Sequence, residues 1–190
     1  MVVASSNAQA KNISTKDVKA RTIHNASGMR VQKLVNEKMR PGNKLDSLSK
    51  LWGCVRVLVI EEVSMVAAAW YNMLDVRSMH GRSKTHDVYE TTYKQPRHHF
   101  GRVPIVIHLG DFLQLSPTAN IGLVEDVNAK NEDGSYKYPE PPSLEVQHAI
   151  RVFGKIPHIF ELRGTKRFKA GDPLIEFLGC MRARRSHDDH

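Results

Sequence analysis

Two short apolar segments that each end in acidic residues constrain the fold of this chain most strongly. The first, VLVI at 57–60, has three β-branched residues out of four and runs directly into Glu61 and Glu62. The second, IVIHL at 105–109, is followed by a Gly-Asp pair that ends at Asp111. Such unbroken apolar runs are typical of strands buried on both faces of a parallel sheet. The sequence therefore predicts an α/β fold in which acidic residues lie at the carboxyl ends of two parallel strands.

Carboxylates at two strand ends suit a magnesium–nucleotide site. Open α/β sheets bind their ligands at the carboxyl ends of the strands. One carboxylate can hold the metal ion while another activates water for attack on a phosphate. The alternative is a pair of core strands with ordinary polar caps, and the occurrence of both segments in this order favours the site.

Five segments resemble the motifs of one helicase group. LVIEEVSM at 58–65 resembles the Walker B strand of superfamily-one DNA helicases, and GDFLQLSP at 110–117 resembles their GDFxQLxP motif. Three more agree in order, namely ASSNAQAKNI at 4–13, TIHNASGM at 22–29 and ELRGTKRFKAGDPLIEFLGCMR at 161–182. The chain is thus similar to Pif-type and RecD-like helicases over nearly its whole length. The resemblance implies a RecA-like P-loop NTPase fold built on a parallel sheet.

One motif of that fold is absent. The 190 residues contain no GxxxxGK[ST], the loop whose amides and lysine cradle the phosphates of a nucleotide. In the family this loop lies just before the segment matched at 4–13. We therefore expect an incomplete sheet without the phosphate-loop strand and helix. Residues 1–157 would belong to a first motor domain and residues 158–190 would open a second.

The implied activity is ATP-dependent unwinding of DNA in the 5′-to-3′ direction by the parent protein, with roles in repair, recombination and telomere maintenance. This chain alone would be inactive because the phosphate loop is absent. One alternative is a non-catalytic nucleic-acid-binding remnant of a helicase. Another is a P-loop ATPase of a different kind, which leaves the GDFxQLxP motif without a reason.

The resemblance also assigns the nucleotide site, with ATP and Mg²⁺ as cofactors. Glu62 would polarise the attacking water, and Glu61 would support magnesium, usually through a water molecule. The family usually has Asp at the position of Glu61, so this carboxylate is displaced by one methylene. Asp111 and Gln114 would couple the γ-phosphate to the DNA track. Arg167 would reach the γ-phosphate from the second domain, because guanidinium presents a charged fork to phosphate oxygens.

The expected partners are single-stranded and duplex DNA. The residues expected to contact DNA are Ser6, Asn7, Thr22, His24, Leu115 and Pro117. The polar ones suit phosphate contacts that carry no sequence information. His24 could equally be a partly buried histidine, and Leu115 and Pro117 could simply shape the turn. The net charge of +8 agrees with a polyanionic partner.

Hydrophobic periodicity and turn signals predict the remaining elements. We expect a strand at 2–5, a helix from a cap at Asn7, a loop with a short helix over 14–43, helices around 45–52, at 66–82, 144–153 and 172–184, strands at 104–109 and 158–162, and an exposed excursion at 125–143. The final helix would be capped by Asp172 and begin at Pro173.

Cysteines, histidines and hydropathy give weaker signals. Cys54 and Cys180 are too few for a disulfide framework, and we expect both to be buried thiols. The pair His98-His99 and the histidine-containing tail at 187–190 do not have zinc-ligand spacing, so magnesium is the only metal predicted. No transmembrane run or targeting segment is visible. We expect a nuclear or mitochondrial location if the source is eukaryotic, and a cytoplasmic one otherwise.

Overall fold

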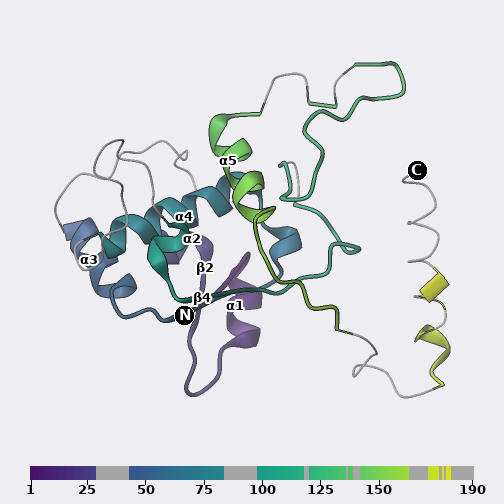
Figure 1. Cartoon of the computed structure of the whole chain (residues 1–190). Helices are drawn as coiled ribbons and strands as arrows, with labels where there is room; N and C mark the ends of the chain where they lie inside the picture. Colours follow the sequence, from purple (N-terminus) through teal and green to yellow (C-terminus); the bar gives the residue numbers. More distant parts are fainter. Residues whose placement is uncertain are drawn as a thin grey trace. The chain divides into compact units, whose positions relative to one another are not determined.

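A computed structural model (Figure 1) describes residues 1–28, 43–83, 98–117, 120–135, 137–138, 142–162, 171–175, 177 and 179–180. The chain divides into two compact units, Met1–Lys155 and Ile156–His190. The assignment of such units to two motor domains stays a prediction. Among the described residues, no helix combines the length and apolar character that a membrane span requires.

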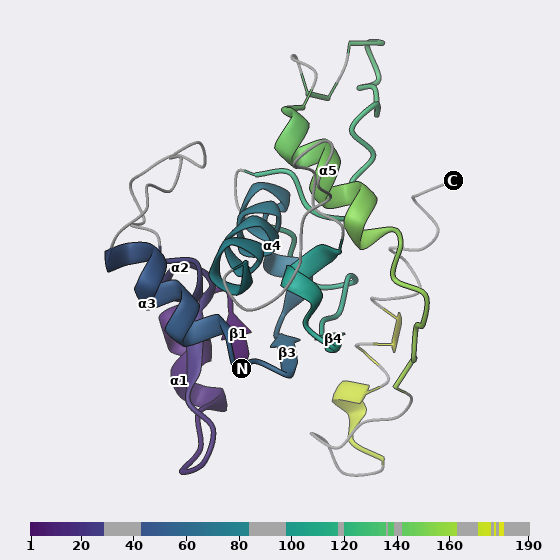
Figure 2. The same cartoon turned by 60° about the vertical axis from the view of Figure 1, so that its left-hand side comes forward.

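The first unit contains a sheet of four parallel strands. They are β1 (Val2–Ala4), β2 (Ala20–Thr22), β3 (Val57–Ile60) and β4 (Ile105–His108), in the order β2-β1-β3-β4. All three pairings are parallel, and Figure 2 shows β1, β3 and β4 side by side. The predicted α/β class with a parallel sheet is confirmed.

The pairing register brings the four carboxyl ends to one edge. Ala4 is paired with Thr22, Val3 with Ile60, and Ile60 in turn with His108. Each strand therefore ends within about one residue of its neighbour, so the polar residues that follow the strands share that edge.

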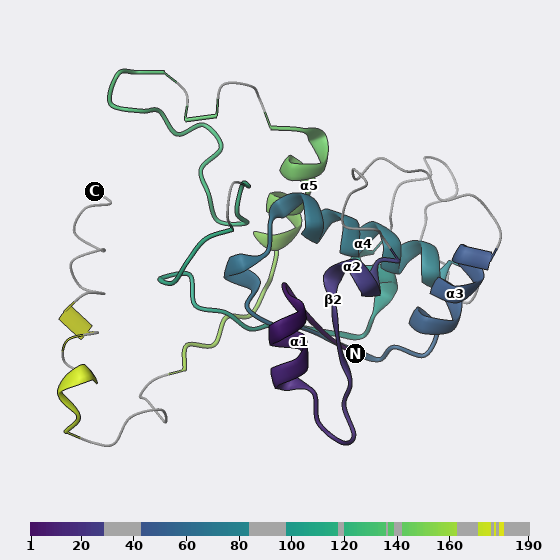
Figure 3. The same cartoon turned by 180° about the vertical axis from the view of Figure 1, so that it is seen from behind.

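Helices pack on both faces of the sheet, and on one of them α1 (Asn7–Ile13) packs against β1 and β2. The other helical elements of this unit are α2 (Ile23–Ala26), α3 (Asn43–Trp52), the 3₁₀ turn η1 (Val63–Met65), α4 (Ala68–Arg82), the 3₁₀ turn η2 (His99–Arg102) and α5 (Leu144–Phe153). The chain leaves β1 toward one edge of the sheet and β3 toward the other. Since such crossovers are right-handed, α1 and α4 lie on opposite faces. Figure 3 shows this arrangement, and α3 and α5 pack against α4.

The core lies between the sheet and α4. Leu58 and Ile60 of β3 and Tyr71 and Leu74 of α4 are almost completely buried. Deletion of one such side chain to alanine typically costs about 2–5 kcal/mol. Trp52 of α3 is also fully buried, and its indole N–H donates to the Ala26 carbonyl at 2.9 Å.

A buried arginine fastens the end of α4. Arg82 is 3% exposed and donates to the carbonyls of Gly101, Trp52 and Val55. Gly101 lies in η2, Trp52 ends α3 and Val55 lies in the loop before β3, so one guanidinium joins α4 to all three segments.

Several sequence predictions of local structure are wrong. Burial on both faces does not hold, because Ile105 and Ile107 of the edge strand β4 are 51% and 40% exposed and Val57 of β3 is 36% exposed. The sequence does not predict β2, because its segment Ala-Arg-Thr has no apolar run, unlike the equally short Val-Val-Ala of β1. Cys54 and Cys180 are exposed rather than buried. In the second unit, residues 158–162 form no strand.

Other predictions agree with the structure. α3, α4 and α5 lie where helical spacing places them, and the described parts of 125–143 form an exposed excursion that turns at Gly134. In the second unit, the Leu174 N–H donates to Asp172 Oδ1 at 2.9 Å. Pro173 follows as the first helical residue, so this predicted cap is confirmed.

Candidate functional site

The carboxyl ends of β3 and β4 are held against each other by backbone hydrogen bonds. The Leu109 N–H donates to the Ile60 carbonyl at 2.9 Å, and the Val63 N–H donates to the Leu109 carbonyl at 2.8 Å. A Cβ added to Gly110 would lie 3.0 Å from both the backbone N and the Cγ1 of Val63. Glycine at this position therefore lets the segment after β4 pass directly beside the acidic exit of β3.

Glu62 has a left-handed backbone conformation, with φ 51° and ψ 49°. A residue with a Cβ adopts this region at a cost of about 1–2 kcal/mol. Glu62 precedes η1, and its carbonyl accepts the Met65 N–H at 2.9 Å. A strained acidic residue at the edge where α/β sheets bind ligands favours a functional role over a plain cap.

Glu61 is still tied to the sheet, because its N–H donates to the Val3 carbonyl at 2.9 Å. Burial raises the pKa of the Glu61 carboxyl above its ordinary 4.5, and the charge of Glu62 raises it further. A hard divalent cation would stabilise the ionised forms of both carboxylates. The residues present therefore fit the predicted magnesium ion, and the ligation by Glu61 stays a prediction.

Asp111 and Gln114 form a hydrogen-bonded turn just after β4. The Gln114 N–H donates to the Asp111 carbonyl at 3.0 Å, and Gln114 Nε2 donates to Asp111 Oδ2 at 3.2 Å. Asp111 Oδ1 accepts the Leu113 N–H at 3.0 Å. Leu115, which follows, is 71% exposed, and Pro117 is half-buried. The two predicted nucleotide residues thus contact each other, and the two apolar residues predicted to face DNA come directly after them.

The N-terminus of α1 differs by one residue from the prediction. Ser6 has an extended backbone, and its hydroxyl accepts the Gln9 N–H at 3.2 Å. Ser6 is therefore the N-cap, and Asn7 is the first helical residue rather than the cap. The Asn7 side chain is exposed at the carboxyl end of β1.

Thr22 and His24 lie at the carboxyl end of β2. The Thr22 hydroxyl accepts the Asn25 N–H at 3.2 Å as the N-cap of α2. The His24 ring packs edge-on against Trp70 with 4.5 Å between centroids, and burial lowers its pKa below the ordinary 6.5. His24 is therefore a partly buried, uncharged histidine at neutral pH, which can offer a hydrogen bond but no full positive charge.

Gln9, which sequence reasoning did not single out, spans the exits of β1 and β3. Its Oε1 accepts the Ser5 hydroxyl at 2.5 Å, and its Nε2 donates to Met65 Sδ at 3.6 Å. Between these strands the crossover connections change direction, and open α/β sheets bind ligands at such a switch point. A signal was available, because Ser5 and Gln9 are one helical turn apart in a polar stretch that follows a strand.

Arg167, predicted to reach the γ-phosphate, lies outside the described residues, as do its neighbours Arg163 and Lys166. The candidate site therefore consists of the strand exits of the first unit. It contains two acidic residues after β3, a hydrogen-bonded acid–amide pair after β4, and small polar side chains after β1 and β2.

A family model described as PIF1-like helicase matches residues 1–169. This match covers most of the chain and confirms the resemblance read from the five motifs. No curated protein matches the chain.

Solved structures of Pif1 helicases match the chain at low sequence identity. Bacteroides Pif1 bound to ssDNA is 21% identical, with a TM-score of 0.43, over 63% of this chain and 24% of that one. A structure described as the basis for DNA unwinding at forked dsDNA by two coordinating Pif1 helicases is 22% identical, with a TM-score of 0.46, over 63% of this chain and 25% of that one. Pif1 helicase from Candida albicans is 26% identical, with a TM-score of 0.41, over 62% of this chain and 24% of that one. The chain spans about a quarter of the length of these proteins.

The backbone strain at Glu62 predicts an unusual response to glycine. Glu62→Gly relieves the left-handed conformation, so we expect unchanged or higher stability, by up to about 1 kcal/mol. Glu61→Gly is the matched control, because Glu61 has no positive φ, and there glycine should cost about 0.5–1 kcal/mol. Thermal unfolding followed by circular dichroism measures both. Equal losses in the two variants would contradict a strained Glu62.

Proposed function

The chain belongs to the PIF1-like helicase family, and from this premise we propose that the carboxyl edge of its sheet is the nucleotide- and DNA-facing edge of a helicase motor segment. The activity of the parent protein would be ATP-dependent unwinding of duplex DNA with 5′-to-3′ movement. Roles in repair, recombination and telomere maintenance, and a nuclear or mitochondrial location in a eukaryote, belong to the same proposal.

One observation carries the proposal: the acidic exit of β3 and the acid–amide turn after β4 are fastened side by side. The bond from Val63 N–H to the Leu109 carbonyl and the close approach at Gly110 hold the two exits together. A nucleotide phosphate at this edge would therefore meet Glu62 and the Asp111–Gln114 pair together.

The chemistry proposed for the edge is phosphoryl transfer to water. Mg²⁺, when bound, would neutralise phosphate charge, with Glu61 holding it through water. Glu62 would accept a hydrogen bond from the attacking water and orient it toward the γ-phosphate. Arg167 would approach from the second domain as a charged fork. Proton acceptance at Glu62 is the step that this chain's own residues would perform.

Coupling to DNA would pass through the turn after β4. Gln114 is bonded to Asp111 through both its backbone and its side chain, so the turn can move as one piece. A shift of Gln114 toward or away from the γ-phosphate would displace the exposed Leu115 beside it. In this proposal, the state of the nucleotide changes the surface that faces the DNA strand.

DNA contact would come from the exits of β1 and β2. The Thr22 hydroxyl oxygen accepts a cap hydrogen bond and can still donate one, whereas the Ser6 hydroxyl also donates to Gln9 Oε1 at 3.3 Å and would exchange that bond for one to a phosphate. With the exposed Asn7 amide and the uncharged His24 ring, these groups suit phosphate oxygens and not particular bases.

A second candidate is a non-catalytic nucleic-acid-binding remnant. Glu61, at a position where the family usually has Asp, favours it. The two candidates differ in whether ATP changes the affinity for DNA.

The missing phosphate loop gives a prediction about catalysis. Without the loop amides and lysine, a triphosphate is poorly held, so this chain should hydrolyse ATP no faster than its Glu62→Gln variant. Phosphate release with and without Mg²⁺ measures this directly. Magnesium-dependent turnover that disappears in Glu62→Gln would contradict the prediction, and would instead show that the edge catalyses hydrolysis by itself.

The DNA interface gives a second prediction. Replacement of Asn7 and His24 together by alanine removes two neutral contacts, and should weaken binding to single-stranded DNA about tenfold, alike for different sequences. The control is Asn12→Ala with His98→Ala, an exposed pair away from the strand exits with the same change in composition. Fluorescence anisotropy at several salt concentrations, with and without ATP, measures the affinity.

Binding should also weaken steeply with salt, because most of the attraction to phosphates comes from lysine and arginine. If the affinity simply follows total charge, the two double variants will bind equally, and the proposed interface is wrong. An effect of ATP on this affinity would favour a motor segment over the non-catalytic remnant.

A further inference from the structure

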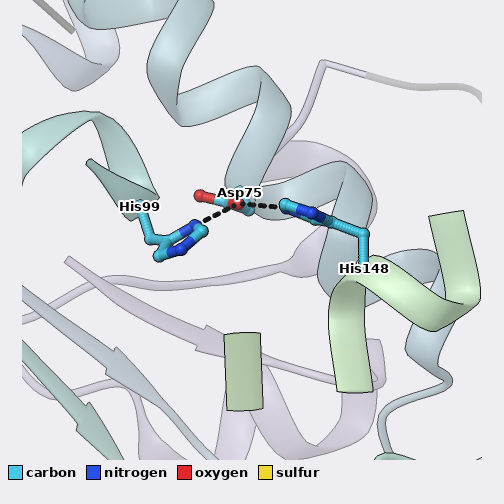
Figure 4. Close-up of side chains that lie close together, drawn as sticks. All are labelled: Asp75, His99 and His148. Carbon is cyan, nitrogen blue, oxygen red and sulfur yellow. Dashed lines mark hydrogen bonds and ion pairs between the residues drawn. The ribbon is translucent and has the colours of Figure 1, made fainter. Parts of the chain in front are cut away.

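Three potential metal ligands converge on one side of α4, away from the strand exits (Figure 4). They are Asp75 of α4, His99 of η2 and His148 of α5. His99 Nδ1 lies 3.1 Å and His148 Nε2 lies 3.4 Å from the same oxygen, Asp75 Oδ2. The two histidines are 24 and 73 residues from Asp75 along the chain, so only the fold brings them together.

The distances from Asp75 Oδ2 to the two histidine nitrogens match the distance between neighbouring ligand atoms in a tetrahedral zinc site. Zinc bonds of about 2.0–2.1 Å to nitrogen and oxygen place neighbouring ligand atoms about 3.3 Å apart. Both separations from Asp75 Oδ2 are close to this value. The three ligand atoms all lie within 4.8 Å of one another, so the two imidazole nitrogens would have to approach each other on binding. Both rings are partly exposed, which leaves them free to rotate inward.

Asp75 has the properties of an anchoring ligand. Its side chain is fully buried, and its other oxygen, Oδ1, accepts the Phe100 N–H, which fixes the plane of the carboxylate. The orientation of the carboxylate is therefore set by a neighbouring bond, as is usual for metal ligands.

Solvent can reach the site from one side. His99 and His148 line an open depression together with Asn72, Met79, Leu144 and Arg151. A bound ion could thus take a water molecule as its fourth ligand, since three protein ligands leave one position of a tetrahedron open.

We propose that Asp75, His99 and His148 bind one divalent transition-metal ion, with zinc as the best fit and water as the fourth ligand. The ion would fasten α5 and η2 to α4, and so close the long segment between η2 and α5 that contains β4 and the Asp111–Gln114 turn. The site is separate from the proposed magnesium site and does not depend on helicase activity. This proposal differs from the sequence analysis, which predicts no zinc site because His98-His99 lacks zinc-ligand spacing. In the fold, His99 combines with distant residues, and His98 takes no part.

The competing explanation is that two histidines merely satisfy a buried carboxylate. In that case both rings donate N–H to Asp75 Oδ2, and the protein gains nothing from zinc. Metal coordination instead needs the ring lone pairs to face the ion, so a bound ion replaces those two hydrogen bonds. The two explanations therefore differ in metal affinity and in the effect of zinc on thermal stability.

The test is a titration of the full chain with zinc chloride against a chromophoric chelator, in a Cys54→Ser/Cys180→Ser background that removes the two exposed thiols. We expect one zinc per chain, and a loss of affinity of at least about 100-fold in His99→Ala and His148→Ala. His98→Ala, next to the site, and His187→Ala/His190→Ala, in the tail, are matched controls that should bind like the parent.

Thermal unfolding gives an independent readout. Zinc at about 100 times its dissociation constant should raise the Tm of the parent by about 5–10 °C and leave the ligand variants unchanged. Should an alanine variant fail to fold, His148→Gln keeps an N–H donor for Asp75 while it removes a good zinc ligand, and it should fold but lose the zinc response. Absence of saturable binding, or equal binding by His148→Gln and the parent, would overturn the proposal.

Discussion

Parallel pairing of the strands is the constraint on which the rest of this structure depends. Backbone bonds align β1 with β3 and β3 with β4, so every strand exit lies at one edge. Parallel sheets favour covered faces, and α4 covers one face while α1 packs on β1 and β2, although Ile105 and Ile107 of β4 stay exposed. The polar residues after each strand are then the groups that the apolar core excludes. The candidate site follows directly from the way in which this sheet is built.

The sequence predicted the parts of the fold that have a strong local signal. β3 and α5 have unbroken or periodic apolar patterns, and the acidic exits were visible because charge follows such a run abruptly. β2 has the sequence Ala-Arg-Thr without an apolar run and depends on its pairing with β1, so no local pattern could reveal it. The sequence also could not predict that Ile105 and Ile107 are exposed, because exposure depends on strand order and not on the residues themselves.

The two sites differ in how much of each can be predicted from the sequence. The strand-exit residues lie in short motifs, so a reader of the sequence can list them, although the αL conformation of Glu62 and the bridging role of Gln9 need coordinates. The cluster of Asp75, His99 and His148 uses three elements that are far apart in the chain. α4 connects the two sites, because it begins shortly after the acidic exit of β3 and carries Asp75 in its middle. A metal ion at Asp75 would therefore stabilise the helix that supports the edge without taking part in its chemistry.

The most direct test of the central claim, that the strand exits form the DNA-facing edge, is amide hydrogen–deuterium exchange of the chain with and without a short oligothymidylate. The account predicts slower exchange at the exits of β1 and β2, in peptides covering residues 5–13 and 22–28, and at the turn in residues 109–117. Peptides that begin β3 and β4, at the opposite edge, should exchange equally with and without DNA. Protection spread evenly over the basic surface, or confined to that opposite edge, would contradict the account.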